Sequence, residues 1–214
     1  MPESWEVVKI ESRCAVRSST LAFGDLLEIN TENDNDTLIH AIKVSDMNMR
    51  GNERDIVRAN TEVRIPDSIA RRKAIPPHSI VFPKRGAAIA TNKKRVTTEC
   101  TLLDPNLIAV VPDQSVNQLF LYYWFETFDL TSLQDLGPTP QLNKKNVDPL
   151  LFPMPKTIDE QEGIAVILDE HDRKLWAHDA QERVLQDLLQ ATLNKLMAEN
   201  IPIHDFNVRR GGEK

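Results

Sequence analysis

Hydrophobic and polar positions follow two different patterns along the chain, and the change lies near residue 155. Before it, hydrophobic residues form short, β-branched runs bounded by Asn, Asp or Pro, as is typical of strands. After it, hydrophobic residues recur at intervals of three and four without a proline until Pro202, which predicts a long helix. The clearest strand patterns lie at residues 7–10, 38–44, 79–82 and 107–111.

These patterns predict an α+β fold, in which a mixed α/β domain precedes a long C-terminal α-helix. We place the first domain at residues 1–155, the helical region at 156–200 and a C-terminal tail at 201–214. A length of 214 residues suits one domain with an appendage.

Residues 115–128 predict a buried helix inside the first domain. Ser115 is a plausible N-cap, and large side chains follow at helical spacing, namely Leu119, Phe120, Tyr123, Trp124 and Phe128. An aromatic row of this kind is able to stack on nucleic-acid bases. Packing in a hydrophobic core is the interpretation that we favour.

The junction between the two patterns contains prolines and then a helix start. Residues 149–155 carry three prolines, which predicts an extended linker. Thr157 suits the N-cap position, and Glu160 completes a capping box three residues later. From there the helix has room for about 40 residues, or about 60 Å at a rise of about 1.5 Å per residue.

The long helix has a hydrophobic row that a domain of this size cannot cover, so we predict that it forms a coiled-coil arm with another helix. Polar residues interrupt the middle of the row, among them His171, His178 and Glu182. The two histidines share a face, but polar positions between helices explain them better than a metal site without a third ligand. The predicted contact residues are Ile164, Leu168, Leu175, Leu185, Leu189 and Leu196.

Charge is unevenly distributed, although the net charge is −6. Residues 64–95 hold nine basic residues and one acid, whereas residues 157–200 hold ten acids and four basic residues. This separation favours one part that meets a polyanion and another that meets protein or solvent. Two ordinary solvated surfaces are the alternative.

The motifs of catalysis are missing. We find no glycine-rich phosphate loop, no dinucleotide turn and no nucleophile elbow, and the five histidines are scattered. We therefore predict no catalytic residues, no cofactor and no metal. No apolar run is long enough for a membrane span and no secretion signal is present, which favours the cytoplasm, with Cys14 and Cys100 as buried free thiols.

Several segments together resemble the specificity subunits of type I restriction-modification systems. Residues 79–95 resemble the family's strand, basic turn and basic loop, and residues 137–145 resemble the sequence before its linker. Residues 153–168 are similar to its linker-to-helix junction, and residues 5–9 and 44–48 also fit. Ala87, Ala88 and Ala90 depart from the pattern, because the loop there is expected to contain more glycine.

The resemblance implies a non-catalytic subunit that reads DNA, while separate subunits methylate adenine with S-adenosylmethionine or cut DNA with ATP. A full subunit of this family carries two recognition domains and two helical regions that pair antiparallel. This chain has one of each, which implies a homodimer through the C-terminal helix that reads a bipartite target. Its implied partners are double-stranded DNA, methyltransferase (M) subunits and, through them, restriction (R) subunits.

Basic and amide side chains in the resembling loops are the predicted DNA contacts, because they suit phosphates and base edges. Residues 143–145 alternatively form a helix-capping turn, and residues 71–73 are alternatively a plain solvated surface. The predicted DNA-binding residues are Lys84, Arg85, Asn92, Lys93, Lys94, Arg95, Gln141, Asn143, Lys144 and Lys145.

Two other functions compete with this one. A self-sufficient DNA methyltransferase or nuclease would need diverged motifs, and the missing cofactor loops argue against it. A structural coiled-coil adaptor would not need the basic residues that are concentrated at 64–95.

Overall fold

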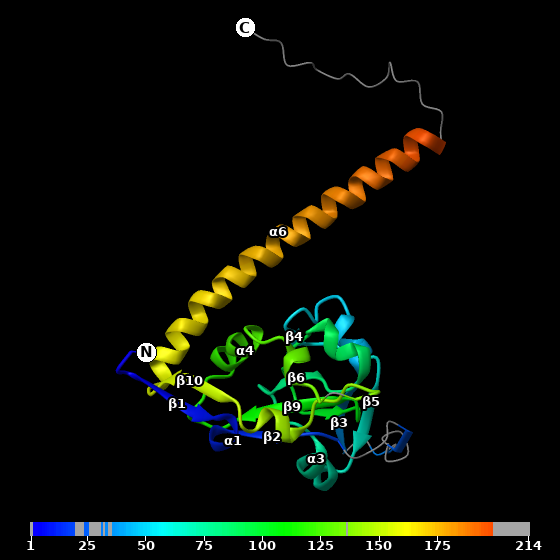
Figure 1. The fold of residues 1–214 in the computed structure, drawn as a ribbon. Coiled ribbons are helices and arrows are strands. Elements are labelled where there is room, and N and C mark those ends of the chain that lie inside the picture. Colours follow the sequence, from blue (N-terminus) through cyan, green and yellow to red (C-terminus); the bar gives the residue numbers. More distant parts are fainter. Residues whose placement is uncertain are drawn as a thin grey trace. The chain divides into compact units, whose positions relative to one another are not determined.

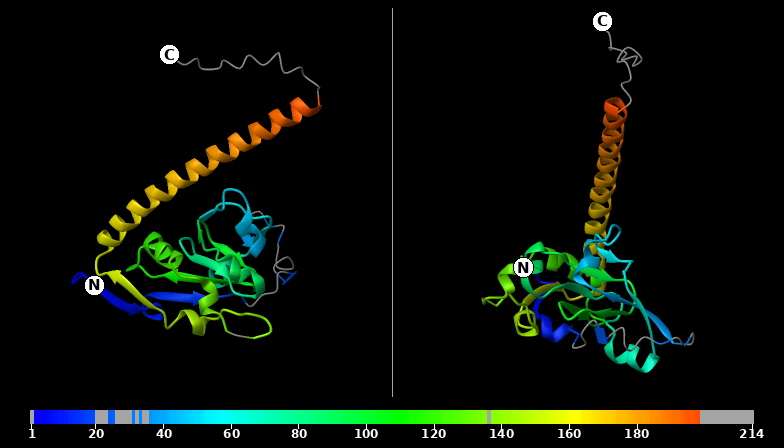
Figure 2. Two further views of the ribbon diagram at one scale, coloured as in Figure 1. Left: turned by 45° about the horizontal axis from the view of Figure 1, so that its top comes forward. Right: turned by 90° about the vertical axis from the view of Figure 1, so that its right-hand side faces the viewer.

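The computed structural model describes residues 2–19, 24–25, 31, 33, 36–135 and 137–198 and divides into two units. The first unit is Met1–Ile167, and it contains every strand of the described residues (Figure 1). The second unit begins at Leu168 and contains most of one helix, α6 (Ile158–Ala198) (Figure 2). The predicted fold class, a mixed α/β domain followed by a long helix, is confirmed. The predicted tail at 201–214 lies outside the described residues.

A five-stranded sheet crosses the first unit. Its neighbours pair antiparallel except for the last two strands, which pair parallel. Every residue of the strand in the middle is buried, because both faces of the sheet are covered there. In order across the sheet, the strands are β2 (Cys14–Arg17), β9 (Leu107–Pro112), β6 (Ile80–Pro83), β7 (Arg95–Thr97) and β4 (Asp55–Ile56).

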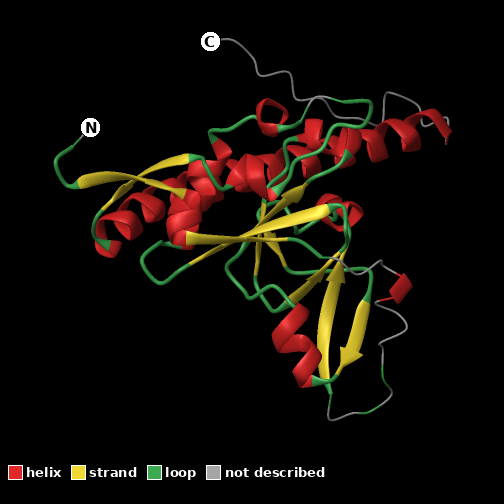
Figure 3. Ribbon diagram, turned by 60° about the horizontal axis from the view of Figure 1, so that its bottom comes forward, coloured by secondary structure: helices red, strands yellow, loops and turns green. Residues whose placement is uncertain are grey.

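A smaller sheet of three strands has a hydrophobic cluster of its own. Its order is β5 (Glu62–Ile65), β3 (Thr37–Ile42) and β8 (Thr101–Leu103). Helix α3 (Asp67–Lys73) lies beside these strands, as Figure 3 shows. Ala70 of this helix joins the cluster with Ile39 of β3.

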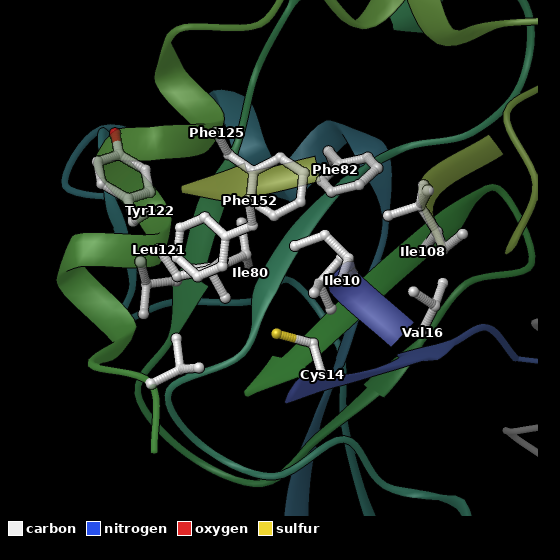
Figure 4. Packing of buried hydrophobic residues seen from close by; sticks show 14 of the residues in the cluster. Ile10, Cys14, Val16, Ile80, Phe82, Ile108, Leu121, Tyr122, Phe125 and Phe152 are labelled. Carbon is white, nitrogen blue, oxygen red and sulfur yellow. The ribbon is translucent and has the colours of Figure 1, made fainter. Parts of the chain in front are cut away.

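The largest core cluster lies where helix α4 (Gln118–Glu126) packs against the five-stranded sheet (Figure 4). The rings of Phe82 and Phe125 are 5.5 Å apart between centroids, and both side chains are fully buried. Of the predicted row, Phe120 is buried in this cluster, and Leu119, Tyr123 and Trp124 are partly buried against it, which confirms the preference for core packing over base stacking at these positions. The predicted cap was wrong, because Asn117 and not Ser115 caps α4 by accepting the Leu119 and Phe120 N–H groups at 3.0 Å.

A two-stranded sheet joins the N-terminus to the segment before α6. Strands β1 (Trp5–Lys9) and β10 (Leu151–Pro155) pair antiparallel, with Trp5 opposite Pro155. The predicted linker is extended, as expected, but it forms a strand. Its prolines are tolerated because a two-stranded sheet consists only of edge strands.

The remaining short elements connect these layers. They are the helices α1 (Ile10–Arg13) and α5 (Lys144–Val147) and the 3-10 helices η1 (Val44–Asn48), η2 (Gly86–Thr91) and η3 (Leu130–Leu133). The four predicted strands are confirmed as β1, β3, β6 and β9, with ends shifted by a few residues.

The start of α6 is fixed to the first unit by polar side chains. Thr157 Oγ1 accepts the Glu160 N–H at 3.4 Å, as the predicted capping box requires. The Glu160 carboxylate, however, accepts the Trp5 indole N–H at 3.0 Å. Gln161 is fully buried and bonds the Asn117 N–H, the Ser115 carbonyl and the Pro155 carbonyl. The first turns of α6 therefore belong to the first unit, whereas the predicted first domain ended at residue 155.

The two cysteines differ in their surroundings, and the prediction that both are buried was wrong for Cys100. Cys14 is buried, and burial, with a smaller contribution from Asp113, raises the pKa of its thiol to about 12. Cys100 is exposed. Because the thiolate is the reactive form, we expect iodoacetamide to modify Cys100 alone in the folded protein at mildly alkaline pH. Peptide mass spectrometry checks this; a repeat in denaturant should label both, and equal native labelling would contradict it.

Candidate nucleic-acid interface

Two predicted basic segments that lie far apart in sequence come together at the end of β6. The Leu142 N–H donates to the Lys84 carbonyl and the Gly86 N–H donates to the Pro140 carbonyl, both at 2.9 Å. Arg85 and Gln141 consequently face each other in an antiparallel bridge. We call Arg85, Gln141, Asn143, Lys144 and Lys145 the β6-end group.

Arg85 is the member of this group best placed to bind an anion. Its side chain is exposed, and no described residue pairs with its guanidinium. The preceding residue, Lys84, is instead buried and is only 9% exposed. Burial lowers the pKa of Lys84, Arg85 lowers it further, and Asp104 opposes both.

Residues 143–147 form a capped turn that carries two exposed lysines. Asn143 caps α5, and its N–H donates to Asn146 Oδ1 at 2.8 Å, so the capping alternative for Asn143 is confirmed. Lys145 pairs with Asp135 at 2.8 Å, and Lys144 pairs with Asp148 at 3.6 Å. The hydrogen bond from Lys145 is the largest cause of the lowered pKa of Asp135. A phosphate would compete with these carboxylates for the lysines.

The run Asn92–Arg95 contains two residues that hold the fold together from inside. Asn92 ends η2 at a φ of 54°, and its side-chain oxygen accepts the Leu130 N–H at 2.9 Å and the Lys94 amine at 3.0 Å. Lys94 is 0% exposed and donates to the Phe128 carbonyl at 2.7 Å. Burial lowers the pKa of Lys94, and Glu126 and Asp129 oppose that shift.

Arg95 and Lys93 both contact η1. Arg95 is half-buried and donates to the Met47 carbonyl at 3.1 Å and to the Lys94 carbonyl at 2.7 Å. Burial is the main cause of its lowered pKa. The Lys93 amine lies at the surface and bonds to the side-chain oxygen of Asn48. We therefore leave Lys84, Asn92, Lys94 and Arg95 out of the proposed DNA surface, because their polar groups are buried or occupied by the protein itself.

The conformation of the loop after Arg85 explains why this loop contains alanines where the family pattern is expected to have glycines. Gly86 has a φ of 64°, a left-handed conformation that favours glycine. Ala87, Ala88 and Ala90 lie in η2, where helical backbone angles suit alanine. Only the first position of this loop therefore needs glycine.

Sequence reasoning missed two exposed arginines between η1 and β5. Arg50 and Arg58 lie in the loop that flanks β4, and no described residue pairs with either guanidinium. The only signal was the recurrence of arginine at positions 50, 54 and 58 around Gly51 and Asn52.

In the second unit, α6 leaves a row of large hydrophobic side chains exposed. Leu175, Leu185 and Leu189 are 60%, 65% and 61% exposed. Val184, Leu188 and Leu193 widen this row. Of the other predicted contact residues, Leu168 is 38% exposed, Leu196 is partly buried, and Ile164 packs against the core of the first unit and is not part of a free row.

Among the described residues, no cluster of three or more His, Cys, Asp or Glu side chains has the arrangement of a metal site. No helix in the described part of the chain has the length and apolarity to span a membrane.

Several solved protein chains share the fold of this protein. A chain from a structure on complex assembly and conformational transition of the type I R-M system has a TM-score of 0.66 and 18% identity, with 91% of this chain and 46% of that chain covered. The HsdS subunit from Thermoanaerobacter tengcongensis gives 0.61 and 18%, with 91% and 45% covered. The S subunit of a type I system from M. genitalium gives 0.55 and 14%, with 91% and 46% covered.

The chain thus spans less than half the length of these solved chains. No curated protein matches it in sequence. The family described as "Type I restriction modification DNA specificity domain" matches residues 2–185, which is most of the chain. This chain therefore belongs to the type I restriction modification DNA specificity domain family.

Proposed function

We propose that the chain is a non-catalytic specificity subunit that binds double-stranded DNA and directs M subunits, and through them R subunits, to a bipartite target in the cytoplasm. The observation that carries this proposal is the β6-end group. Main-chain pairing brings residues 84–86 and 140–142 together and leaves the Arg85 guanidinium exposed beside Gln141. The family match over residues 2–185 supports the same function.

The β6-end group contains the side chains that DNA recognition requires. A guanidinium is able to bond two acceptors of guanine, and a glutamine amide matches the edge of adenine. Lysines bind phosphates and supply affinity without reading sequence. We assign Arg85 and Gln141 to base reading and Lys144 and Lys145 to the phosphates, with Asn143 positioning α5.

The proposed assembly is a homodimer through α6. The exposed row on this helix supports it, because leucines that are more than half exposed are stabilised by a second apolar surface. Pairing with a second copy would give the assembly two recognition domains and two helical regions. Two identical recognition domains would then read two identical inverted half-sites.

The test is the salt dependence of DNA binding by the chain co-expressed with its M subunit. The probe is the duplex selected from a random pool by that complex. If about six phosphates are contacted per dimer, we expect affinity to fall roughly a thousandfold between about 50 and 200 mM salt. Arg85→Ala should weaken binding about 5- to 150-fold and relax the preferred sequence at one position.

Arg71→Ala is the matched control, because Arg71 is an exposed arginine of α3 outside the β6-end group. It should leave sequence preference unchanged. Absence of selected duplexes, or an affinity that does not change with salt, would refute DNA recognition by this chain.

A further inference from the structure

We infer that residues 44–60 form a second DNA-contacting element, in which Arg50 and Arg58 bind backbone phosphates. This inference rests on the proposed function and extends it to a loop that precedes β6 and Arg85 in the sequence. The loop runs from η1 through β4 toward β5 and is drawn in light blue to cyan in Figure 2.

Buried polar side chains give this loop a defined shape. Asp46 is 1% exposed, and its carboxylate accepts the Lys43 N–H at 2.8 Å and the Asn60 side-chain amide at 2.6 Å. Asn52 is 0% exposed; it donates to the Asp46 and Arg58 carbonyls at 2.8 Å and accepts the Val57 and Arg58 N–H groups at 3.0 and 3.2 Å. Two buried side chains thus hold both ends of the loop together.

The three arginines of the loop are divided between two roles. Arg54 is 9% exposed, and its guanidinium binds both carboxylate oxygens of Asp55, at 2.8 and 3.1 Å for Oδ2. The Arg50 and Arg58 guanidinium groups form no ion pair or hydrogen bond with any described residue, and both side chains are exposed. Gly51, at a φ of 94°, provides the left-handed turn directly after Arg50. Asp55 therefore neutralises Arg54, whereas Arg50 and Arg58 are available to bind a ligand.

Hydrogen bonds connect this loop to the basic run at residues 92–95. Lys93 bonds to Asn48, and Arg95 donates to the Met47 carbonyl at 3.1 Å. Strand β4 also pairs with β7, with Asp55 opposite Val96. The surface that contains Lys93 thus continues into the loop, where Glu53 is an exposed acid that interacts electrostatically with Arg95.

The chemistry of these groups favours phosphate as the ligand. A guanidinium presents a rigid fork of donors that matches phosphate oxygens, and it stays charged at any physiological pH. A loop that is already ordered loses little conformational entropy on binding. An acidic protein surface is the other ligand that such a group would bind, and the experiment separates the two.

The test is the double variant Arg50→Ala with Arg58→Ala, in the complex with the M subunit and on the selected duplex. Loss of two phosphate contacts per chain, and therefore of four per dimer, should make the slope of log affinity against log salt shallower by about 3.6 and weaken binding at low salt, with the preferred sequence unchanged. Arg50→Lys with Arg58→Lys should retain most of the slope. The control Arg71→Ala with Arg72→Ala removes two exposed charges from α3 and should leave the slope as it is.

The outcomes separate this inference from the proposed function. If the double variant keeps the wild-type slope while Arg85→Ala weakens binding, the loop is not a DNA contact but the proposed function stands. If the double variant loses the M subunit and keeps its DNA slope, the loop binds protein, which also overturns the inference. If the wild-type complex selects no duplex, the proposed function itself fails.

Discussion

Replacing both Leu185 and Leu189 with aspartate is expected to convert a dimer into a single chain of 24.3 kDa at micromolar concentration. Both leucines are more than 60% exposed on α6 when the chain is alone. Burial of one leucine contributes about 1.5–3 kcal/mol, and a symmetric dimer buries four of these side chains. Their loss therefore raises the dissociation constant by roughly 10⁴-fold or more, since each 1.4 kcal/mol is about tenfold.

Light scattering over a range of concentrations measures this change. The matched control is Gln190→Asp with Asn194→Asp, which adds the same charges to exposed positions on the opposite side of α6 at helical spacing. The control should remain a dimer, and far-ultraviolet circular dichroism should show the same helix content in both variants. A dimer that survives the leucine substitutions would mean that another surface holds it, and a wild-type monomer would refute the dimer altogether.

The substitution Lys94→Met is expected to lower both the free energy of unfolding and DNA affinity, without changing the salt dependence of binding. Lys94 is 0% exposed, and its amine connects Asn92 at the end of η2 to the Phe128 carbonyl. Losing a hydrogen bond to a charged group costs about 1.5–3 kcal/mol. DNA affinity falls because η2, which links Arg85 to Lys93, loses its attachment.

The matched control for this prediction is Lys93→Met, which makes the same chemical change at the neighbouring surface residue. It should have little effect on stability and should make the salt slope shallower by about 1.8, because one surface amine that is available to a phosphate is lost from each chain of the dimer. Denaturant unfolding and DNA titration measure both variants. A shallower slope for Lys94→Met would show that its amine reaches DNA, contrary to its buried position.

The pH dependence of stability provides a second test of the buried amine. Burial lowers the pKa of Lys94 below its usual value of 10.5, so the folded state binds fewer protons than the unfolded state between those two values. Stability of the wild type, relative to Lys94→Met, should therefore rise as the pH increases through that window. A difference that falls with pH would contradict this assignment.

Local sequence patterns were sufficient for the elements that are long or strongly hydrophobic. The spacing of α6, the β-branched runs of β6 and β9 and the aromatic spacing of α4 are signals within a single segment. Strands β2, β4, β5, β7 and β8 have two to four residues each. Their sequences carry too little periodicity, because partners from elsewhere in the chain stabilise them. Strand β10 was hidden by its prolines, which an edge strand tolerates.

The sequence predicted the basic segments of the candidate site, but it did not distinguish their buried side chains from their exposed ones. Asn92, Lys93, Lys94 and Arg95 are all polar in sequence, yet the Lys94 side chain is fully buried whereas the Lys93 amine lies at the surface. The cause is that Phe128, Leu130 and Met47 supply backbone partners from distant segments. No local rule indicates where those partners lie.

By itself the sequence determined that this chain has a mixed α/β domain, a long helix with an apolar row, and basic loops that resemble those of a DNA specificity subunit. Only the tertiary structure decided that Arg85 lies beside Gln141, that Lys94 is internal, and that Arg50 and Arg58 are exposed. The physical reason is that hydrophobic periodicity is a property of one segment, whereas the burial and pairing of a polar side chain depend on every segment that packs around it.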